Sequence, residues 1–213
     1  MMTSTIIDFH THRTDAVAAL ISTDPRQFDP QPGRWYSVGF HPWDTDQALG
    51  DDEFALLEQC AMHPQALAIG ETGMDNLRGG RLDVQATVLE RHLRLAGQLG
   101  KPVVIHSVRT ASQIVEVRRK AELTAVPLAI HGMRGNANVA RILLNAGCFL
   151  SFGPQFNPET VLATPLDRLL IETDDSPVGI DEVAGHVAHV LGLTIEQVKT
   201  TAAGNARRLL KMD

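Results

Sequence analysis

The chain has 213 residues, of which 44% are hydrophobic and 21% are charged, and its formal net charge is −6. This composition is that of a globular protein with a substantial core, and it excludes a disordered or low-complexity chain. The longest apolar runs fall well short of the roughly 18 residues that a membrane span needs. The acidic balance excludes a broad basic surface for nucleic acid. We therefore expect a single domain over residues 1–213, located in the cytoplasm, with no membrane partner and no obligate protein partner.

Short apolar runs alternate with stretches of helical periodicity along most of the chain. Strands are predicted at residues 6–9, 17–22, 36–39, 66–71, 102–107, 127–131, 148–152 and 168–173. Helices are predicted from Asp51 to before Pro64, through 86–96 to Gly100, at 114–120 and 137–145, and after a capping box at Thr194 and Gln197. Apolar strands that alternate with helices indicate a parallel sheet. Eight of them predict an α/β fold, a TIM-like (β/α)8 barrel, which is irregular around its second and third strands because residues 24–35 show no crossover helix.

Several predicted strands end in a side chain that can bind a metal ion. These residues are His10, His12, Glu71, His106, His131 and Asp174. The carboxyl ends of barrel strands gather on one face, and His10 and His12 share a side of their strand because side chains alternate. A single such histidine is more often a hydrogen-bonded core residue, and Glu71 alone would equally be a surface carboxylate. Their combination predicts a joint metal site.

The acidic residues of this set are assigned roles in catalysis. Asp174 would ligate a metal and take a proton from its bound water, and Glu71, between Gly70 and Gly73, would reach two ions. Glu172 lies two residues before Asp174, so both side chains project to the same side of the strand. Glu172 would either add a metal ligand or hydrogen-bond a ligating histidine. Mixed imidazole and carboxylate donors admit Zn, Mn or Mg, so the identity of the ion is open. Two such ions would favour hydrolysis without a covalent intermediate.

The sequence resembles the TatD-type metal-dependent hydrolases, a branch of the amidohydrolase superfamily, nearly from end to end. The resemblance rests on the order and spacing of DFHTH, GFHPW, AIGETGMD, HLRLAGQLGKPVVIHS, IHGMRG, ETDDSP and GNARRLL. It implies a TIM-like barrel, two divalent cations and deoxyribonuclease activity at a DNA end. By resemblance, one ion has the ligands His10, His12, Glu71 and Asp174, and the second has Glu71, His106 and His131.

The chain departs from the family pattern where substrate would bind. It is shorter than is usual, and the loop after GMD reads NLRGGR without aromatic residues. We expect His41, Arg109 and Arg134 to face the substrate, His41 either at a phosphate or behind a metal ligand. The loop arginines would either bind phosphate or pair with nearby carboxylates; they are Arg78, Arg81, Arg109 and Arg134. Trp43 would either stack a base or pack against the rim.

Three functions remain open from the sequence. The leading hypothesis is a divalent-metal-dependent phosphodiesterase, a deoxyribonuclease acting on DNA ends through a metal-activated water, with Glu71 and Asp174 catalytic. The alternative is a hydrolase of a small ester, amide, lactone or phosphate with the same binuclear centre, which the acidic charge and the 5% aromatic content favour. A metal-binding barrel without turnover is the third.

Overall fold

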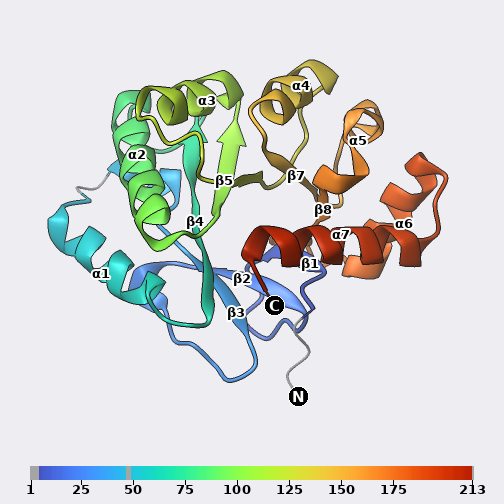
Figure 1. Cartoon of the computed structure of the whole chain (residues 1–213), viewed down its shortest axis with the longest axis horizontal. Coiled ribbons are helices and arrows are strands. Elements are labelled where there is room, and N and C mark those ends of the chain that lie inside the picture. Colours follow the sequence, from blue (N-terminus) through green and yellow to red (C-terminus); the bar gives the residue numbers. More distant parts are fainter. Residues whose placement is uncertain (1–4, 47–48, 213) are drawn as a thin grey trace. The chain divides into compact units, whose positions relative to one another are not determined.

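The computed structural model describes residues 5–46 and 49–212, and within these ranges eight β-strands alternate with helices (Figure 1). The strands follow one another in chain order as a closed barrel of parallel strands, which confirms the predicted (β/α)8 fold. The strands are β1 (Asp8–Thr11), β2 (Ala19–Thr23), β3 (Trp35–Val38), β4 (Ala66–Asp75), β5 (Val103–Val108), β6 (Leu128–Ile130), β7 (Phe149–Phe152) and β8 (Leu169–Ile171).

Helices follow most of the strands. The α-helices are α1 (Asp51–Ala61), α2 (Leu82–Leu99), α3 (Ala111–Lys120), α4 (Ala137–Asn145), α5 (Pro158–Ala163), α6 (Ile180–Leu191) and α7 (Ile195–Leu210), and the 3-10 helices are η1 (Pro25–Gln27), η2 (Pro42–Asp46) and η3 (Leu166–Arg168). The predicted capping box of α7 is confirmed, because the side chains of Thr194 and Gln197 each accept the backbone N–H of the other. Among the described residues, no helix has the length and apolar character to cross a lipid bilayer.

The chain folds into two compact units. The first comprises Met1–Ile21, Pro32–Arg34 and Ile130–Asp213, and the second comprises Ser22–Gln31 and Trp35–Ala129. The expected single domain over residues 1–213 stays a prediction.

In the first unit, β8 pairs with the strand that opens the chain. Asp8 of β1 is in register with Ile171 of β8 on one side and with Ala19 of β2 on the other, and all three strands run in the same direction. Helix α7 packs against β8 and against α6 (Figure 1). The parallel pairing of β1 with β8 places the residues that follow each strand at the same edge of the sheet.

In the second unit, β4 lies between β3 and β5 and is longer than the sequence predicted. The strand was expected to end at Glu71, and this boundary is wrong, because the next four residues continue the ladder with β5 up to the pair Asp75↔Val108. A polar and glycine-rich composition after Glu71 favoured a loop. The hydrogen bonds that the neighbouring strand offers override that local preference. Asp75 is therefore the last residue of β4.

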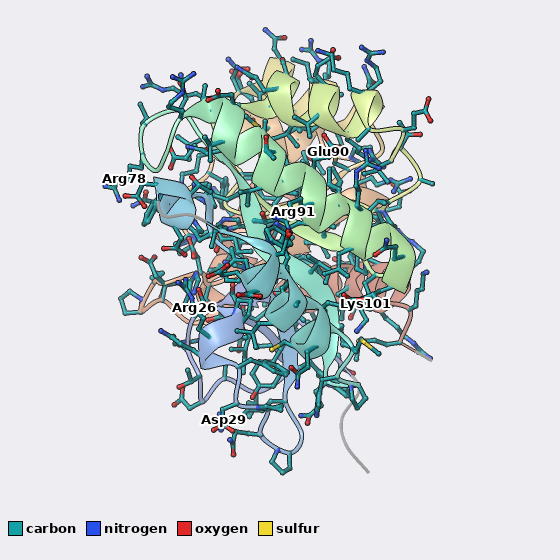
Figure 2. All side chains as sticks on the ribbon, turned by 90° about the vertical axis from the view of Figure 1, so that its left-hand side faces the viewer. Arg26, Asp29, Arg78, Glu90, Arg91 and Lys101 are labelled. Atoms are coloured by element: carbon teal, nitrogen blue, oxygen red, sulfur yellow. The ribbon has the colours of Figure 1, made fainter. Side chains whose placement is uncertain are left out.

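Side chains of α2 and of the turn after it tie the second unit together (Figure 2). The guanidinium carbon of Arg91 lies 3.7 Å from the centroid of the Phe54 ring, and its Nη2 lies 2.8 Å from Oδ1 of Asp51 at the start of α1. The ammonium of Lys101 donates to the carbonyl oxygens of Ala61 and Ala66, at the two ends of the α1–β4 connection. These contacts fix α1 against α2 and, with them, the start of β4.

The predicted irregular side is present between β2 and β3. Within residues 24–34, all of them described, the connection contains the 3-10 turn η1 and no α-helix. Asp24 caps this turn by accepting the Arg26 N–H at 2.7 Å, and Pro25 occupies its first position, where a missing N–H costs nothing. Helices α5 and α6 were not predicted from the sequence.

His92 of α2 is a fully buried histidine with both ring nitrogens in use. Its Nε2 accepts the backbone N–H of Phe40 at 3.1 Å, and its Nδ1–H donates to the carbonyl oxygen of Val88 at 2.8 Å. Burial lowers the pKa of His92 to about 4, because the protonated ring would lose its hydration. The neutral imidazole is thus a structural link between α2 and the segment after β3.

We expect the free energy of unfolding to fall by roughly 3 kcal/mol as the pH falls from about 6.5 to about 4 because of His92. The pKa of His92 is lower in the folded state than in the unfolded chain, so the unfolded chain takes up the proton first. The stabilisation is complete at a pH above the pKa of His92 in the unfolded chain, and it is lost as the pH falls through the pKa of His92 in the folded protein. Urea denaturation across this pH range measures it. His92→Gln can still accept the Phe40 N–H but does not titrate, and an equal pH slope in both proteins would contradict the expectation.

Candidate metal centre

Three of the predicted ligands come together after β1 and β8 in the first unit. His10 is buried within β1, His12 follows that strand, and Asp174 follows β8. Oδ1 of Asp174 lies 3.7 Å from Nε2 of His10 and 3.6 Å from Nε2 of His12. The two imidazole rings are edge-on at 5.0 Å between centroids. One carboxylate oxygen therefore faces two ring nitrogens, as the strand parity predicted for the histidines.

Backbone pairing holds Asp174 in this position. Its N–H donates to the His10 carbonyl oxygen at 2.9 Å, and its carbonyl oxygen accepts the His12 N–H at 3.2 Å. Asp174 has a φ of +56°, in the left-handed region that a residue with a side chain adopts at a cost of about 1–3 kcal/mol. The two hydrogen bonds to the backbone of His10 and His12 offset this cost and aim the carboxylate at the histidines.

Asp8 supports the same junction and was given no role from the sequence alone. Its carboxylate accepts the backbone N–H of Thr173 at 2.9 Å and the hydroxyl of Thr173 at 2.6 Å. Burial raises the pKa of Asp8 to about 6, although both hydrogen bonds oppose that shift. The signal was present in the sequence, because Asp8 shares a strand face with His10 and His12, yet a carboxylate inside a strand gives no indication of its partner.

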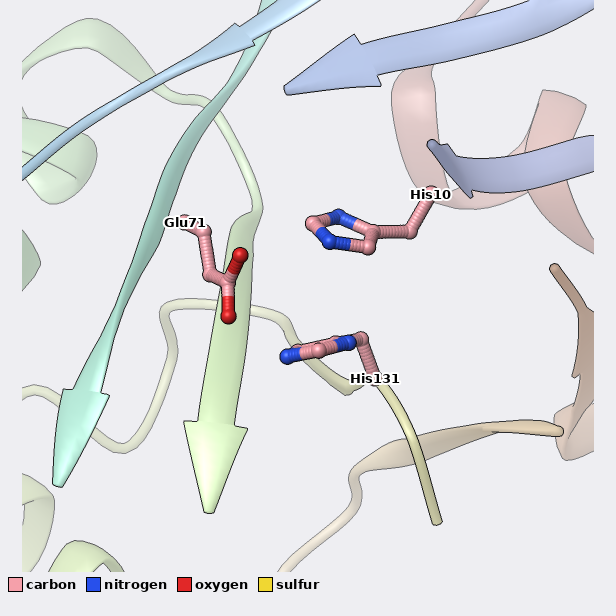
Figure 3. A group of neighbouring side chains, drawn as sticks. All are labelled: His10, Glu71 and His131. Atoms are coloured by element: carbon pink, nitrogen blue, oxygen red, sulfur yellow. The ribbon is translucent and has the colours of Figure 1, made fainter. Parts of the chain in front are cut away.

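His131 and Glu172 form a second pair in the first unit. Oε1 of Glu172 accepts the N–H of Gly132 at 2.5 Å and lies 3.3 Å from Nδ1 of His131. Burial acts to raise the pKa of the Glu172 carboxyl, but the hydrogen bond from His131 and the charges of His131 and His10 outweigh it, so the pKa lies below its ordinary value. Figure 3 shows the rings of His10 and His131, whose centroids are 4.2 Å apart, and Glu71 on β4.

The donor atoms of the first unit fit a divalent ion. We define the first-unit cluster as His10, His12, His131, Glu172 and Asp174. The ligand atoms of His10, His12 and Asp174 lie within 4.8 Å of one another, and so do those of His131, Glu172 and Asp174. Oε2 of Glu172 is buried and has no hydrogen-bond partner within residues 5–46 and 49–212. An ionised oxygen buried in this way is costly unless a cation faces it. Imidazole and carboxylate donors suit Zn and Mn, and carboxylates admit Mg.

The second unit carries its own cluster, which we define as His41, Glu71 and His106. Their ligand atoms also lie within 4.8 Å of one another. Oε1 of Glu71 is 3.1 Å from Nε2 of His41 and 2.9 Å from Nδ1 of His106. Nδ1 of His41 accepts the Trp43 N–H at 3.2 Å, so the neutral ring of His41 carries its hydrogen on Nε2 and donates it to Glu71. His41 thus orients Glu71; its expected contact with substrate stays a prediction.

Asp75 joins the second-unit cluster from the end of β4. Its Oδ2 accepts the indole N–H of Trp43 at 2.7 Å and lies 3.1 Å from Nε2 of His106. Burial acts to raise the pKa of Asp75, but hydrogen bonds from Trp43, from the Leu77 backbone and from His106 outweigh it, and the pKa lies below its ordinary value. Sequence reasoning missed Asp75 because it placed the residue in a loop. The signal was the final residue of the motif AIGETGMD.

The arginines expected to face substrate lie outside both clusters. Arg109, with a φ of +56°, and Arg134 are exposed, and within the described residues neither guanidinium has an ion-pair partner. Arg81 instead pairs with Asp83 at 3.0 Å, which was the alternative for the loop arginines. The guanidinium carbon of Arg78 lies 4.6 Å from the centroid of the Trp43 ring. The role of Arg109 and Arg134 in substrate binding stays a prediction.

A parallel barrel whose strand ends carry imidazole and carboxylate clusters is typical of metal-dependent enzymes. The sequence matches the family described as TatD related DNase over residues 26–211, and the chain belongs to this family of metal-dependent hydrolases. The metal-dependent hydrolase YabD of Bacillus subtilis is 27% identical over 198 residues, covering 83% of this chain and 77% of YabD. The metal-dependent hydrolase TatD of Mycobacterium tuberculosis is 30% identical over 198 residues, covering 81% and 74%. The crystal structure of YjjV, a TatD homologue from Escherichia coli, has the same fold, with a TM-score of 0.81, 19% identity and 100% coverage of both chains.

Gly73 allows β4 to approach the backbone of His106. Its φ is +150°, and a Cβ at this position would lie 2.0 Å from the His106 carbonyl oxygen. Gly73↔His106 is a register pair of β4 and β5, so a side chain here would push apart the two strands that carry Glu71 and His106. Only glycine satisfies both the conformation and the space.

We expect Gly73→Ala to destabilise the protein by about 3 kcal/mol or more, because it combines overpacking with a strained backbone. Gly204→Ala is the matched control: Gly204 lies in α7, a Cβ there would meet no described atom within 4 Å, and alanine should stabilise the helix by about 0.5–1 kcal/mol. Thermal unfolding of the two variants measures both effects. A Gly73→Ala protein as stable as the wild type would show that β4 and β5 do not need this close approach.

Proposed function

We propose that the chain is a divalent-metal-dependent phosphodiesterase that removes nucleotides from DNA ends. The observation that carries the proposal is the carboxylate of Asp174, one oxygen of which lies within 3.7 Å of a ring nitrogen of both His10 and His12. The family description, TatD related DNase, supports DNA as the substrate class. The ions would be two in number, and Mg, Mn and Zn are the candidates that the donors admit.

The proposed ligands are those that the family resemblance assigns. One ion would be held by His10, His12, Glu71 and Asp174, and the other by Glu71, His106 and His131. Divalent ions in such a site supply a water of lowered pKa and polarise the ester bond under attack. Glu172 would orient His131 through the contact of its Oε1 with Nδ1.

Asp174 is the proposed proton acceptor. Its side chain is 21% exposed, so a water molecule can reach it, and its other contacts hold it at the end of β8. As the water oxygen bonds to phosphorus and the ester P–O bond breaks, Asp174 would take one proton of that water, and the departing oxygen would take up a proton from solvent. Glu71, only 4% exposed, would face His41 and His106 through its Oε1.

Arginines in the loops after the strands would hold the phosphates. Arg109 and Arg134 are exposed and, among the described residues, lack an acidic partner, so they are available to an anion. The stacked pair of Arg78 and Trp43 offers a cation beside an aromatic face. Because the net charge is −6, such local cations rather than the protein's overall field would bind DNA.

The acidic net charge also favours a second candidate, a hydrolase of a small ester, amide, lactone or phosphate that uses the same centre. A small substrate would need the metal clusters but not an extended row of cations. The two candidates therefore differ in what the loop arginines do, and share every step at Asp174.

We expect Glu71→Gln and Asp174→Asn each to lower turnover at least about 100-fold, because each removes a charged ligand and Asp174→Asn also removes the proton acceptor. Release of mononucleotides from single-stranded DNA with added Mg or Mn is the measurement, and a chelator should abolish it. Glu90→Gln, in an exposed ion pair of α2, is the control that should keep wild-type rates. Full DNA hydrolysis by the Asp174→Asn protein would exclude this role.

For a DNA substrate, Arg109→Gln and Arg134→Gln should each raise KM about 10-fold, since each loses a charge-assisted hydrogen bond to phosphate. For a small uncharged chromogenic ester, neither change should matter. Arg94→Gln, which removes an exposed arginine of α2 paired with Glu90, is the matched control. Wild-type enzyme that hydrolyses the esters and leaves DNA intact would favour the small-substrate candidate instead.

A further inference from the structure

Asp75 is a buried carboxylate whose two oxygens receive hydrogen bonds from different parts of the second unit. It is 3% exposed. Oδ1 accepts the backbone N–H groups of Leu77 at 2.8 Å and Arg78 at 3.2 Å. Oδ2 faces the Trp43 indole N–H at 2.7 Å and Nε2 of His106 at 3.1 Å. The carboxylate thus has a side that fixes the turn after β4 and a side that faces the imidazole of His106.

Gln85 of α2 holds the backbone of Asp75. Its Oε1 accepts the Asp75 N–H at 2.7 Å, and its Nε2 donates to the Asp75 carbonyl oxygen at 3.1 Å. Gln85 is fully buried, so these bonds are shielded from competing water. The position of Asp75 is therefore fixed independently of His106, which is what an orienting group requires.

His106 lies between two carboxylates, one at each ring nitrogen. Nδ1 is 2.9 Å from Oε1 of Glu71 and 3.3 Å from Nε2 of His41, so it faces the second-unit cluster. Nε2, the other ring nitrogen, faces Asp75. A neutral imidazole has one N–H and one lone pair, and a metal binds the lone pair. The nitrogen that donates to Asp75 is then the one that cannot bind a metal.

We infer that Asp75 is a positioning residue that keeps the hydrogen of His106 on Nε2 and presents Nδ1 as the metal-ligating nitrogen. The inference rests on the proposed function, because it concerns how the chain prepares one of the proposed ligands. Direct ligation by Asp75 is disfavoured by geometry, since four donors already surround its two oxygens. A carboxylate behind a ligating imidazole also raises the basicity of the ring.

Asp75→Asn tests the inference because an amide has only one oxygen, whereas both carboxylate oxygens of Asp75 face hydrogen-bond donors. If its oxygen stays with the N–H groups of Leu77 and Arg78, its NH₂ faces Trp43 and His106, and a donor cannot accept the Nε2 hydrogen. If the amide turns over, the NH₂ faces the two backbone donors instead. Trp43→Phe is the matched control, because it removes the other donor to Oδ2 and leaves the carboxylate facing His106.

The first measurement uses wild-type protein loaded with Zn²⁺, which is diamagnetic, and long-range ¹H–¹⁵N NMR of the histidine rings, with His106 assigned by comparison with His106→Asn. The inference expects a hydrogen on Nε2 and coordination at Nδ1. The second measurement is Zn²⁺ affinity by competition with a chromophoric chelator. Asp75→Asn should weaken it about 10- to 100-fold, and Trp43→Phe should leave it within a few-fold of wild type.

Coordination through Nε2 in the wild type would overturn the inference without any variant, so a failure of Asp75→Asn to fold does not remove the test. Wild-type affinity in a folded Asp75→Asn protein would also overturn it. So would equal losses in Asp75→Asn and Trp43→Phe, because they would show that Asp75 acts only by anchoring the Trp43 turn. A wild-type protein that takes up no Zn²⁺, Mn²⁺ or Mg²⁺ would overturn the proposed function and the inference together, whereas uptake with Nε2 coordination overturns the inference alone.

Discussion

The buried pairing of Asp8 with Thr173 is the constraint on which the first-unit cluster depends. Two hydrogen bonds, from the N–H and the hydroxyl of Thr173, converge on one carboxylate inside the junction of β1 and β8. They fix the residue immediately before Asp174, so the left-handed turn at Asp174 begins from a defined point. The left-handed conformation of Asp174 costs about 1–3 kcal/mol, and two backbone hydrogen bonds, to His10 and His12, offset this cost. Residues of β1 and the residues that follow β8 are thereby held together.

Both units use the same physical device to prepare an imidazole. In the first unit Glu172 contacts Nδ1 of His131, and in the second Asp75 contacts Nε2 of His106. Each carboxylate is buried and is itself held by backbone N–H groups, so it can remain ionised without bulk water. Opposite ring nitrogens are engaged in the two histidines, Nδ1 in His131 and Nε2 in His106. A barrel that delivers side chains from different strand ends needs such local control of each ring.

The sequence located the candidate ligands on or beside the right strands, but it did not identify their hydrogen-bond partners. The apolar runs placed His10 on β1, Glu71 on β4 and His131 directly after β6, since this pattern is local. Asp75 could not, because its place in β4 depends on pairing with Val108 of β5, a contact that no local composition encodes. The order of helices and strands and the irregular side between β2 and β3 followed from periodicity and proline content. The boundary of β4 did not, because hydrogen bonds to β5 decide it. Helix α5 was missed although its start carries local signals, since Asn157 accepts the Glu159 N–H and Pro158 occupies the first position.

The loop arginines differ in whether an acidic side chain neutralises them. The chain is acidic overall, and its loop arginines divide into those already neutralised and those exposed: Arg81 pairs with Asp83, whereas Arg109 has no acidic partner in the described residues. Exposed ion pairs contribute little to stability. The exposed arginines beside the strand ends are open to the anion binding proposed above, because a guanidinium can donate two hydrogen bonds to a phosphate. Arg109 also has a φ of +56°, a left-handed conformation that costs about 1–3 kcal/mol and that its surroundings must hold in place.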